Sequence, residues 1–168
     1  MDSKKWFVFM AKANEQLFKK TEIKFGSAFI KLIMKPSFHN HFSFLINWDD
    51  KKEDVIWEKL TWEKLIDAPK FYDQEQVDKG LIPTMSIQKG QLKKTQVNKV
   101  IDSAKSIVIK PQLSFEKGWT LDGAFYTLQI GRTSDSITFS WHTIPEGWHE
   151  LESLIQEILD VEELALKG

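Results

Sequence analysis

The stretch that decides the fold runs from Trp119 to Leu164. It reads Trp119-Thr-Leu-Asp-Gly-Ala-Phe-Tyr-Thr-Leu-Gln-Ile130, passes a polar turn at Gly131 to Ser136, and continues Ile137-Thr-Phe-Ser-Trp-His-Thr143 and Ile144-Pro-Glu-Gly-Trp148. Apolar residues alternate up to Trp141 and then recur with a period near 3.6 after Trp148. This change of period is typical of a β-hairpin that leads into a C-terminal helix.

The hairpin and the helix each predict a set of contacts. Aromatic and β-branched pairs across a hairpin stabilise a sheet by up to ~1 kcal/mol each. Pro145 is suited to the first turn of a helix, where no N–H is needed. The predicted hairpin contacts join Ala124, Tyr126, Leu128 and Ile130 to Ile137, Phe139 and Trp141. The helix is apolar at Trp148, Leu151, Leu154, Ile155, Ile158, Leu159 and Leu164 and acidic at Glu146, Glu150, Glu152, Glu157, Asp160, Glu162 and Glu163.

Patterns earlier in the chain predict more strands and helices. Alternation favours two strands, over residues 22–34 and 38–48, joined at Pro36-Ser37 as an antiparallel pair. A helix is expected over Thr95–Lys105, with Val97, Val100, Ile101 and Ala104 on one face. Residues Lys12–Lys20 are expected to form either a short helix or a simple link, and Val55–Leu60 a strand or extended piece. The remaining predictions are a short helix capped by Thr61, and a loop over Asp73–Gln91 with one short strand at Thr84–Ile87.

Length and composition place these elements in one domain. A chain of 168 residues can bury roughly 70% of its unfolded surface, and twelve Phe and seven Trp supply a large apolar core. The predicted fold is therefore a single α+β domain over residues 1–168. It has a mainly antiparallel sheet of about five to seven strands, with the Thr95 and Glu146 helices packed on one face. The sequence does not decide whether residues 1–20 are well ordered or loosely ordered.

Apolar runs and cysteine usage predict the compartment. The run Trp6 to Met10 is too short for the core of a signal peptide, and no run reaches the ~20 residues that a membrane span needs. The chain has no Cys, which excludes a disulfide framework, a thiol nucleophile and a thiolate zinc site. We therefore expect a cytoplasmic protein that does not contact the membrane.

Charge argues against a nucleic-acid partner. The net charge is −1, and Arg132 is the only arginine, although arginine is the commonest reader of guanine and phosphate. A group of lysines could still form a basic patch that binds nucleic acid. Because acids elsewhere in the chain balance these lysines, we expect an ordinary solvated surface instead. The lysines concerned are Lys89, Lys93, Lys94, Lys99 and Lys105.

Catalytic and metal-binding patterns are weak. Two histidines in His39-Asn40-His41 would share one face of a strand about 7 Å apart, which is compatible with metal binding, but we expect exposed or edge-strand polar residues. His142 and His149 are seven residues apart, whereas ligand pairs on a helix prefer four. The sequence holds no Gly-rich phosphate loop, no Gly-x-Ser-x-Gly and no His-Glu-x-x-His. We predict no enzyme, no catalytic residue, no cofactor and no metal.

Part of the deciding stretch resembles a group of known proteins. The residues are Trp119-Thr-Leu-Asp122-Gly123-Ala-Phe-Tyr126-Thr-Leu128, Phe139-Ser-Trp141, and Pro145-Glu-Gly-Trp148-His-Glu-Leu151 with Leu154-Ile155. They resemble the ending of small bacterial α+β proteins, some of which look like immunity proteins for secreted toxins. The resemblance implies a cytoplasmic inhibitor that binds one toxin tightly, often through an acidic surface that faces a basic enzyme.

The sequence thus predicts a tryptophan-rich bacterial protein that acts by stoichiometric protein binding, as a toxin inhibitor. The expected contact surface is the acidic face of the last helix at Glu150, Glu157 and Asp160, because charge complementarity favours association with a basic toxin domain. The alternative is a small-ligand-binding α+β domain, whose Phe and Trp side chains would line a cavity. The oligomeric state stays open.

Overall fold

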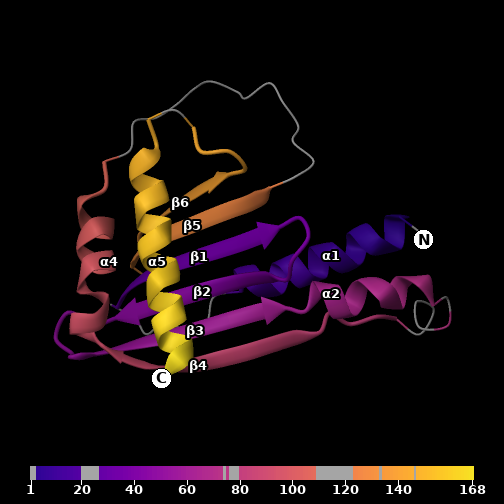
Figure 1. Ribbon diagram of the computed structural model, residues 1–168, viewed down its shortest axis with the longest axis horizontal. Coiled ribbons are helices and arrows are strands. Elements are labelled where there is room, and N and C mark those ends of the chain that lie inside the picture. Colours follow the sequence, from indigo (N-terminus) through magenta and orange to yellow (C-terminus); the bar gives the residue numbers. More distant parts are fainter. Residues whose placement is uncertain are drawn as a thin grey trace.

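The computed structural model describes residues 3–19, 27–73, 75, 80–108, 123–132, 134–145 and 147–168, and it shows a six-stranded antiparallel sheet with helices on both faces (Figure 1). The strands lie in the order β4-β3-β2-β1-β5-β6. Their bounds are β1 Ala28–Pro36, β2 His41–Trp48, β3 Asp54–Trp62, β4 Met85–Lys93, β5 Ala124–Arg132 and β6 Ser136–Trp141. The helices are α1 Ser3–Phe18, α2 Lys64–Asp67, the 3-10 helix η1 Ala68–Tyr72, α4 Lys94–Ser106 and α5 His149–Lys167. The predicted α+β class is confirmed.

Strand pairing follows the alternation in the sequence. Phe44 of β2 lies opposite Leu32 of β1, which confirms the predicted antiparallel pair. Leu128 of β5 lies opposite Phe139 of β6, as the predicted contacts of the second hairpin require. Gly123, which precedes β5, has a φ of +132°, a value that glycine adopts at little cost. Asp122, which precedes Gly123 in the sequence, lies outside the described residues.

The larger core lies between the sheet and the pair α4 and α5. Val97, Val100, Ile101 and Ala104 of α4 are buried there, as their spacing predicts. They meet apolar residues of α5 and of the strands: Ile30, Leu32, Phe44, Ile46, Trp48, Val55, Trp57, Leu128, Trp141, Leu151, Leu154, Ile155, Ile158, Val161 and Ala165. Of the described tryptophans, Trp48, Trp57, Trp62 and Trp141 are buried, so their predicted role in the core is confirmed.

A second core lies on the opposite face of the sheet, under α1. Phe9 and Ala13 of α1 pack with Trp62 at the end of β3 and with Phe71 of η1. The rings of Trp6 and Phe71 meet edge to face with centroids 4.7 Å apart. Aromatic pairs of this kind contribute about 0.5–1.5 kcal/mol beyond area burial. The sequence predicts helices on one face only, and α1 adds a cover to the other.

Buried cations join the C-terminal end of α1 to β1. The Lys31 ammonium, on a residue only 3% exposed, donates a hydrogen bond of 2.8 Å to the carbonyl of Lys19. A cation at this position also interacts favourably with the negative end of the helix dipole. Lys35, two residues on, lies over the rings of Phe18 and Phe125 at 5.6 and 4.4 Å. The end of α1 is thus held by Lys31, and Lys35 sits between an α1 ring and a β5 ring.

Several predicted boundaries are wrong. The first helix begins at Ser3 instead of Lys12, so the apolar run Trp6 to Met10 is helical. Thr61 lies within β3, and Glu63 precedes α2. The short strand predicted within residues 84–87 is the nine-residue strand β4. Pro145 precedes the helix, which begins at His149. Among the described helices, none combines the length and apolar character needed to cross a bilayer.

Candidate functional site

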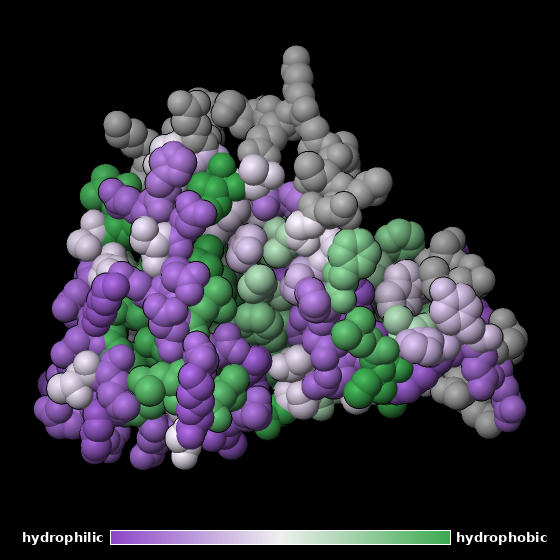
Figure 2. All heavy atoms as spheres, in the orientation of Figure 1, coloured by the Kyte–Doolittle hydropathy of each residue, from purple (hydrophilic) through white to green (hydrophobic). Residues whose placement is uncertain are grey.

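The predicted contact residues Glu150, Glu157 and Asp160 all lie on α5, along its seam with α4. Leu151, Leu154 and Ile158 turn to the core, which leaves the acids on the outer part of the helix pair. Figure 2 shows hydrophilic atoms gathered over α4 and α5, with hydrophobic atoms between them. The structure therefore places the predicted residues in one row along a groove.

The first hollow of this seam contains Glu150. It has a volume of about 290 Å³, and Ser103, Ser106 and Ser153 also line it. The carboxylate of Glu150 is exposed and accepts a hydrogen bond of 3.2 Å from the backbone N–H of Val108. This end of the seam is therefore polar and open to a partner.

The second hollow contains Glu157 and Asp160. It has a volume of about 330 Å³ and is bordered on the α4 side by Gln96, Lys99 and Val100. Oε1 of Glu157 lies 3.2 Å from the Lys99 ammonium, and Oε2 is buried without a hydrogen-bond partner among the described residues. The side chain of Glu157 is 14% exposed, so a solvated face does not describe it. Its orphan oxygen is an acceptor that a donor from a bound partner would satisfy.

The rest of the predicted acidic face is divided. Glu162 is buried against the sheet, where it lies 2.5 Å from the ammonium of Lys59. Glu152 and Glu163 are exposed, and Glu163 pairs with Lys167 one turn away. Glu146 lies outside the described residues. The sequence groups Glu162 with the acidic residues opposite the apolar stripe, and this placement is wrong, because Glu162 follows Ile158 by one turn and shares its buried side.

His39 and His41 lie in different elements and differ in burial. His39 is exposed in the turn before β2, whereas His41 lies in this interior strand and is 8% exposed. The imidazole of His41 packs edge to face on Trp62 at 5.0 Å, and burial together with Lys64 and Lys35 lowers its pKa to about 4. The expectation of an exposed or edge position is wrong for His41, because α1 and its neighbours cover this face of β2. Among the described residues, no group of three metal-binding side chains comes together.

Asp67 forms a buried polar centre that the sequence does not reveal. Its two carboxylate oxygens accept four hydrogen bonds of 2.6 to 2.8 Å, from Trp62 Nε1, Lys70 Nζ, and the backbone N–H and hydroxyl of Thr84. Burial raises the pKa of Asp67, but these hydrogen bonds outweigh burial and hold the pKa below its usual value. Each lone pair is occupied, so this carboxylate joins β3, η1 and the segment before β4.

The lysines of the nucleic-acid alternative lie close to acceptors. Lys93 contacts Asp54 at 2.6 Å, and Lys105 lies 3.7 Å from Asp50. Lys94 donates to the Asp50 carbonyl, and Lys99 pairs with Glu157. These lysines therefore share their surface with acids rather than forming a uniform basic stripe.

A third hollow lies beside α1, and the sequence analysis did not find it. It has a volume of about 300 Å³, and the described residues that line it opposite the first half of α1 are Phe71, Gly80 and Leu81. The signal that could have found it is the helical spacing of Lys5, Val8 and Lys12, three and four residues apart. The consecutive apolar residues Trp6 to Met10 concealed that spacing.

Comparison of the chain with protein-family models, curated proteins and solved structures gave no significant match. The function therefore has to be argued from the geometry of these surfaces.

Proposed function

We propose that this protein acts by stoichiometric binding of another protein, as a bacterial cytoplasmic immunity protein that neutralises a basic toxin domain. The observation that carries the proposal is the row of Glu150, Glu157 and Asp160 along the α4–α5 seam, next to two hollows. A row of carboxylates beside hollows matches a partner that inserts lysine or arginine side chains. Charged rows of this kind raise association rates and select partners.

Glu157 gives the proposed interface a specific anchor point. Its buried Oε2 has no hydrogen-bond partner, although the Lys99 ammonium lies near Oε1. A buried acceptor without a partner costs about 1–3 kcal/mol. Once the Glu157 side chain turns out into the hollow, a guanidinium from the partner would pair with both carboxylate oxygens and would remove that cost.

The interior of the protein supports a binding role over a catalytic one. Asp67 has four donors on its two oxygens and no lone pair left for a substrate. His41 is packed on Trp62, and burial keeps its pKa near 4, so its ring stays neutral at physiological pH. The buried titratable groups thus serve the fold.

The proposal is tested by measuring association with the product of the gene adjacent to the one that encodes this chain. Glu150 and Asp160 are the residues to reverse, because both are exposed, whereas a lysine at position 157 would lie beside Lys99 and be repelled by it. The double variant E150K/D160K should slow association about tenfold in surface plasmon resonance at low salt, with the melting temperature unchanged.

The matched control is E152K/E163K, which makes the same change of charge on α5 at exposed residues that line neither hollow. It should slow association by less than about threefold, because only the long-range field changes. Equal slowing by both variants, or no association of the wild type, would contradict the proposed surface.

A further inference from the structure

The hollow beside α1 is built from an apolar wall and a basic rim. Val8 and Phe9 of α1, Phe71 of η1 and Leu81 form the wall. Lys4, Lys5 and Lys12 also line it. Residues 3–19 contain four lysines, of which these are three, and a single acid, Glu15. No acidic side chain is among the described residues that line the hollow.

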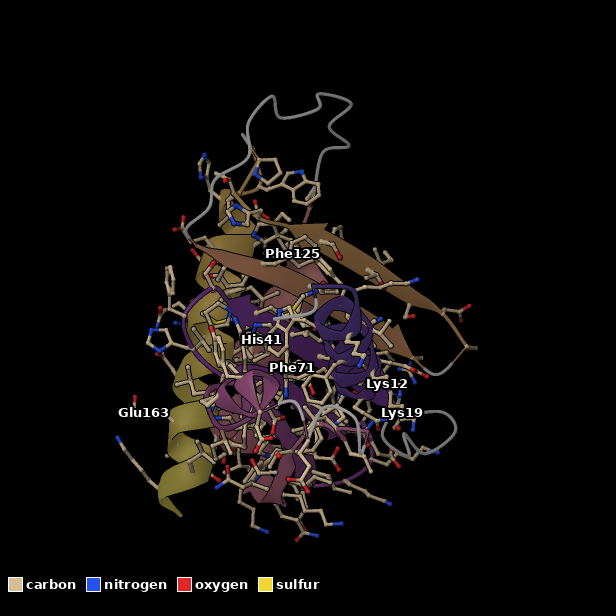
Figure 3. The ribbon with its side chains drawn as sticks, turned by 90° about the vertical axis from the view of Figure 1, so that its right-hand side faces the viewer. Lys12, Lys19, His41, Phe71, Phe125 and Glu163 are labelled. Carbon is tan, nitrogen blue, oxygen red and sulfur yellow. The ribbon has the colours of Figure 1, made fainter. Side chains whose placement is uncertain are left out.

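The wall of this hollow is pre-formed. Phe9 and Phe71 are buried, and their rings meet edge to face with centroids 4.9 Å apart. Behind them lies Trp62, whose indole is fixed by Asp67. Figure 3 views the molecule from the end at which α1 begins, and Lys12 of α1 and Phe71 of η1 are both labelled there. A rigid apolar wall avoids the cost of ordering side chains when a ligand binds.

The chemistry of the lining selects one class of ligand. An apolar body is favoured by burial against Val8 and Leu81, at the lower end of the volume range of small-molecule sites. An anionic group is favoured by the basic rim, where the flexible stem of Lys12 lets its ammonium reach a head group. A cationic ligand of the same shape would meet like charge. The volume of about 300 Å³ equals about ten water volumes, which suits a body of about ten non-hydrogen atoms.

We propose that this hollow is a binding site for a small amphiphilic anion, a molecule with a carboxylate or similar head on an apolar body. The site lies at the α1 end of the molecule and is independent of the α4–α5 seam. A negative result for ligand binding at this hollow would therefore leave the proposed protein binding at the α4–α5 seam untouched, and the reverse also holds.

The test uses decanoate as the probe and decyltrimethylammonium as the probe of opposite charge, both below their micelle concentrations. Isothermal titration calorimetry of the full chain should give a dissociation constant for decanoate of about 10 µM to 1 mM, since ligands of this size bind in that range. Decyltrimethylammonium should bind at least tenfold more weakly, because the rim is basic.

Two pairs of variants locate the site. Val8 lines the hollow and its neighbour Phe7 does not, and both are more than half exposed, so V8E and F7E are matched in chemistry and are expected to fold. V8E should weaken decanoate binding at least tenfold, and F7E should leave it within twofold. Lys12→Gln should weaken binding about threefold, and the control Lys19→Gln, at a residue outside the hollow, should not.

The outcomes separate the inference from its rivals. Selective binding of decanoate that V8E and K12Q impair supports the site. Three results would overturn it: no binding of decanoate up to about 10 mM, which is about tenfold above the weakest dissociation constant expected, equal binding of both probes, or equal effects of each variant and its control. Binding only to vesicles of an anionic lipid, without binding of free decanoate, would also overturn it and would identify a membrane contact instead.

Discussion

The indole N–H of Trp62 donates a hydrogen bond of 2.8 Å to Oδ2 of Asp67, and both residues are almost completely buried. Trp62 ends β3 and contributes its ring to the core under α1, whereas Asp67 ends α2. This single bond therefore connects the sheet, the cover formed by α1 and the helical segment that supports the hollow beside it.

The replacement Asp67→Asn should destabilise the protein by about 2–4 kcal/mol. Both carboxylate oxygens accept donors, so an amide NH₂ would face a donor in either orientation. Urea unfolding at pH 7 measures the loss. The control Asp102→Asn, on the exposed side of α4, should stay within about 0.5 kcal/mol of the wild type. An equal effect of both substitutions would show that Asp67 is not a structural centre.

His41 should make the protein less stable in mild acid. The folded state holds the pKa of His41 at about 4, whereas the unfolded chain has the ordinary value of 6.5, so below 6.5 the unfolded state binds the extra proton. Stability should fall as the pH drops from 6.5 to 4, by up to about 3 kcal/mol in total. Unfolding free energies of H41Q across this range should lack that decline, whereas H39Q should keep it because His39 is exposed.

Lys31 should give a pH dependence of the same sign in alkali. Burial lowers its pKa to about 8 from 10.5, although Glu58 opposes the shift, so between these values the unfolded chain binds more protons than the folded one. The free energy of unfolding should therefore rise as the pH increases from 8 to 10.5. The variant Lys31→Met should show a smaller rise than the wild type, and Lys12→Met, at an exposed residue, should match the wild type. Identical slopes for both variants would exclude Lys31 as the source.

Gly131 should not tolerate a side chain. It lies at the end of β5 with a φ of +155°, and a Cβ there would come within 2.1 Å of the Asp135 carbonyl oxygen. Gly131→Ala should cost about 2–4 kcal/mol through clash and strain. Gly147→Ala has a positive φ of +86° but nothing within 4 Å, so it should cost only about 1 kcal/mol. Thermal unfolding distinguishes the two, and equal losses would contradict the predicted clash.

Local patterns predicted those parts of the fold in which sequence neighbours decide the structure. The register that places Leu128 opposite Phe139 follows from alternation, and the buried face of α4 follows from the spacing of Val97 and Ile101. The length of β4 was underestimated, because an exposed edge strand has no apolar face that alternation could reveal. Gly90, which lies against the Trp57 ring, is the residue of β4 whose type fits the pairing with β3.

Long-range contacts limited what could be predicted of the sites. The acidic residues of the α4–α5 seam were found from helical spacing, but the pairing of Glu157 with Lys99 depends on how two distant helices pack. The burial of His41 likewise depends on a helix about thirty residues earlier in the chain that crosses its strand. A pattern in one segment contains no information about the segment that covers it.

The position of β1 in the sheet has a kinetic consequence. Strands β1 to β4 form a meander in which each strand pairs with its neighbour in the chain, and β5 and β6 form a separate hairpin. Only the β1–β5 ladder, with Lys31 opposite Gln129, joins the two units across a long stretch of chain. Closing so long a loop costs entropy before the ladder repays it. From this topology we expect the merging of these two units to limit the rate of folding.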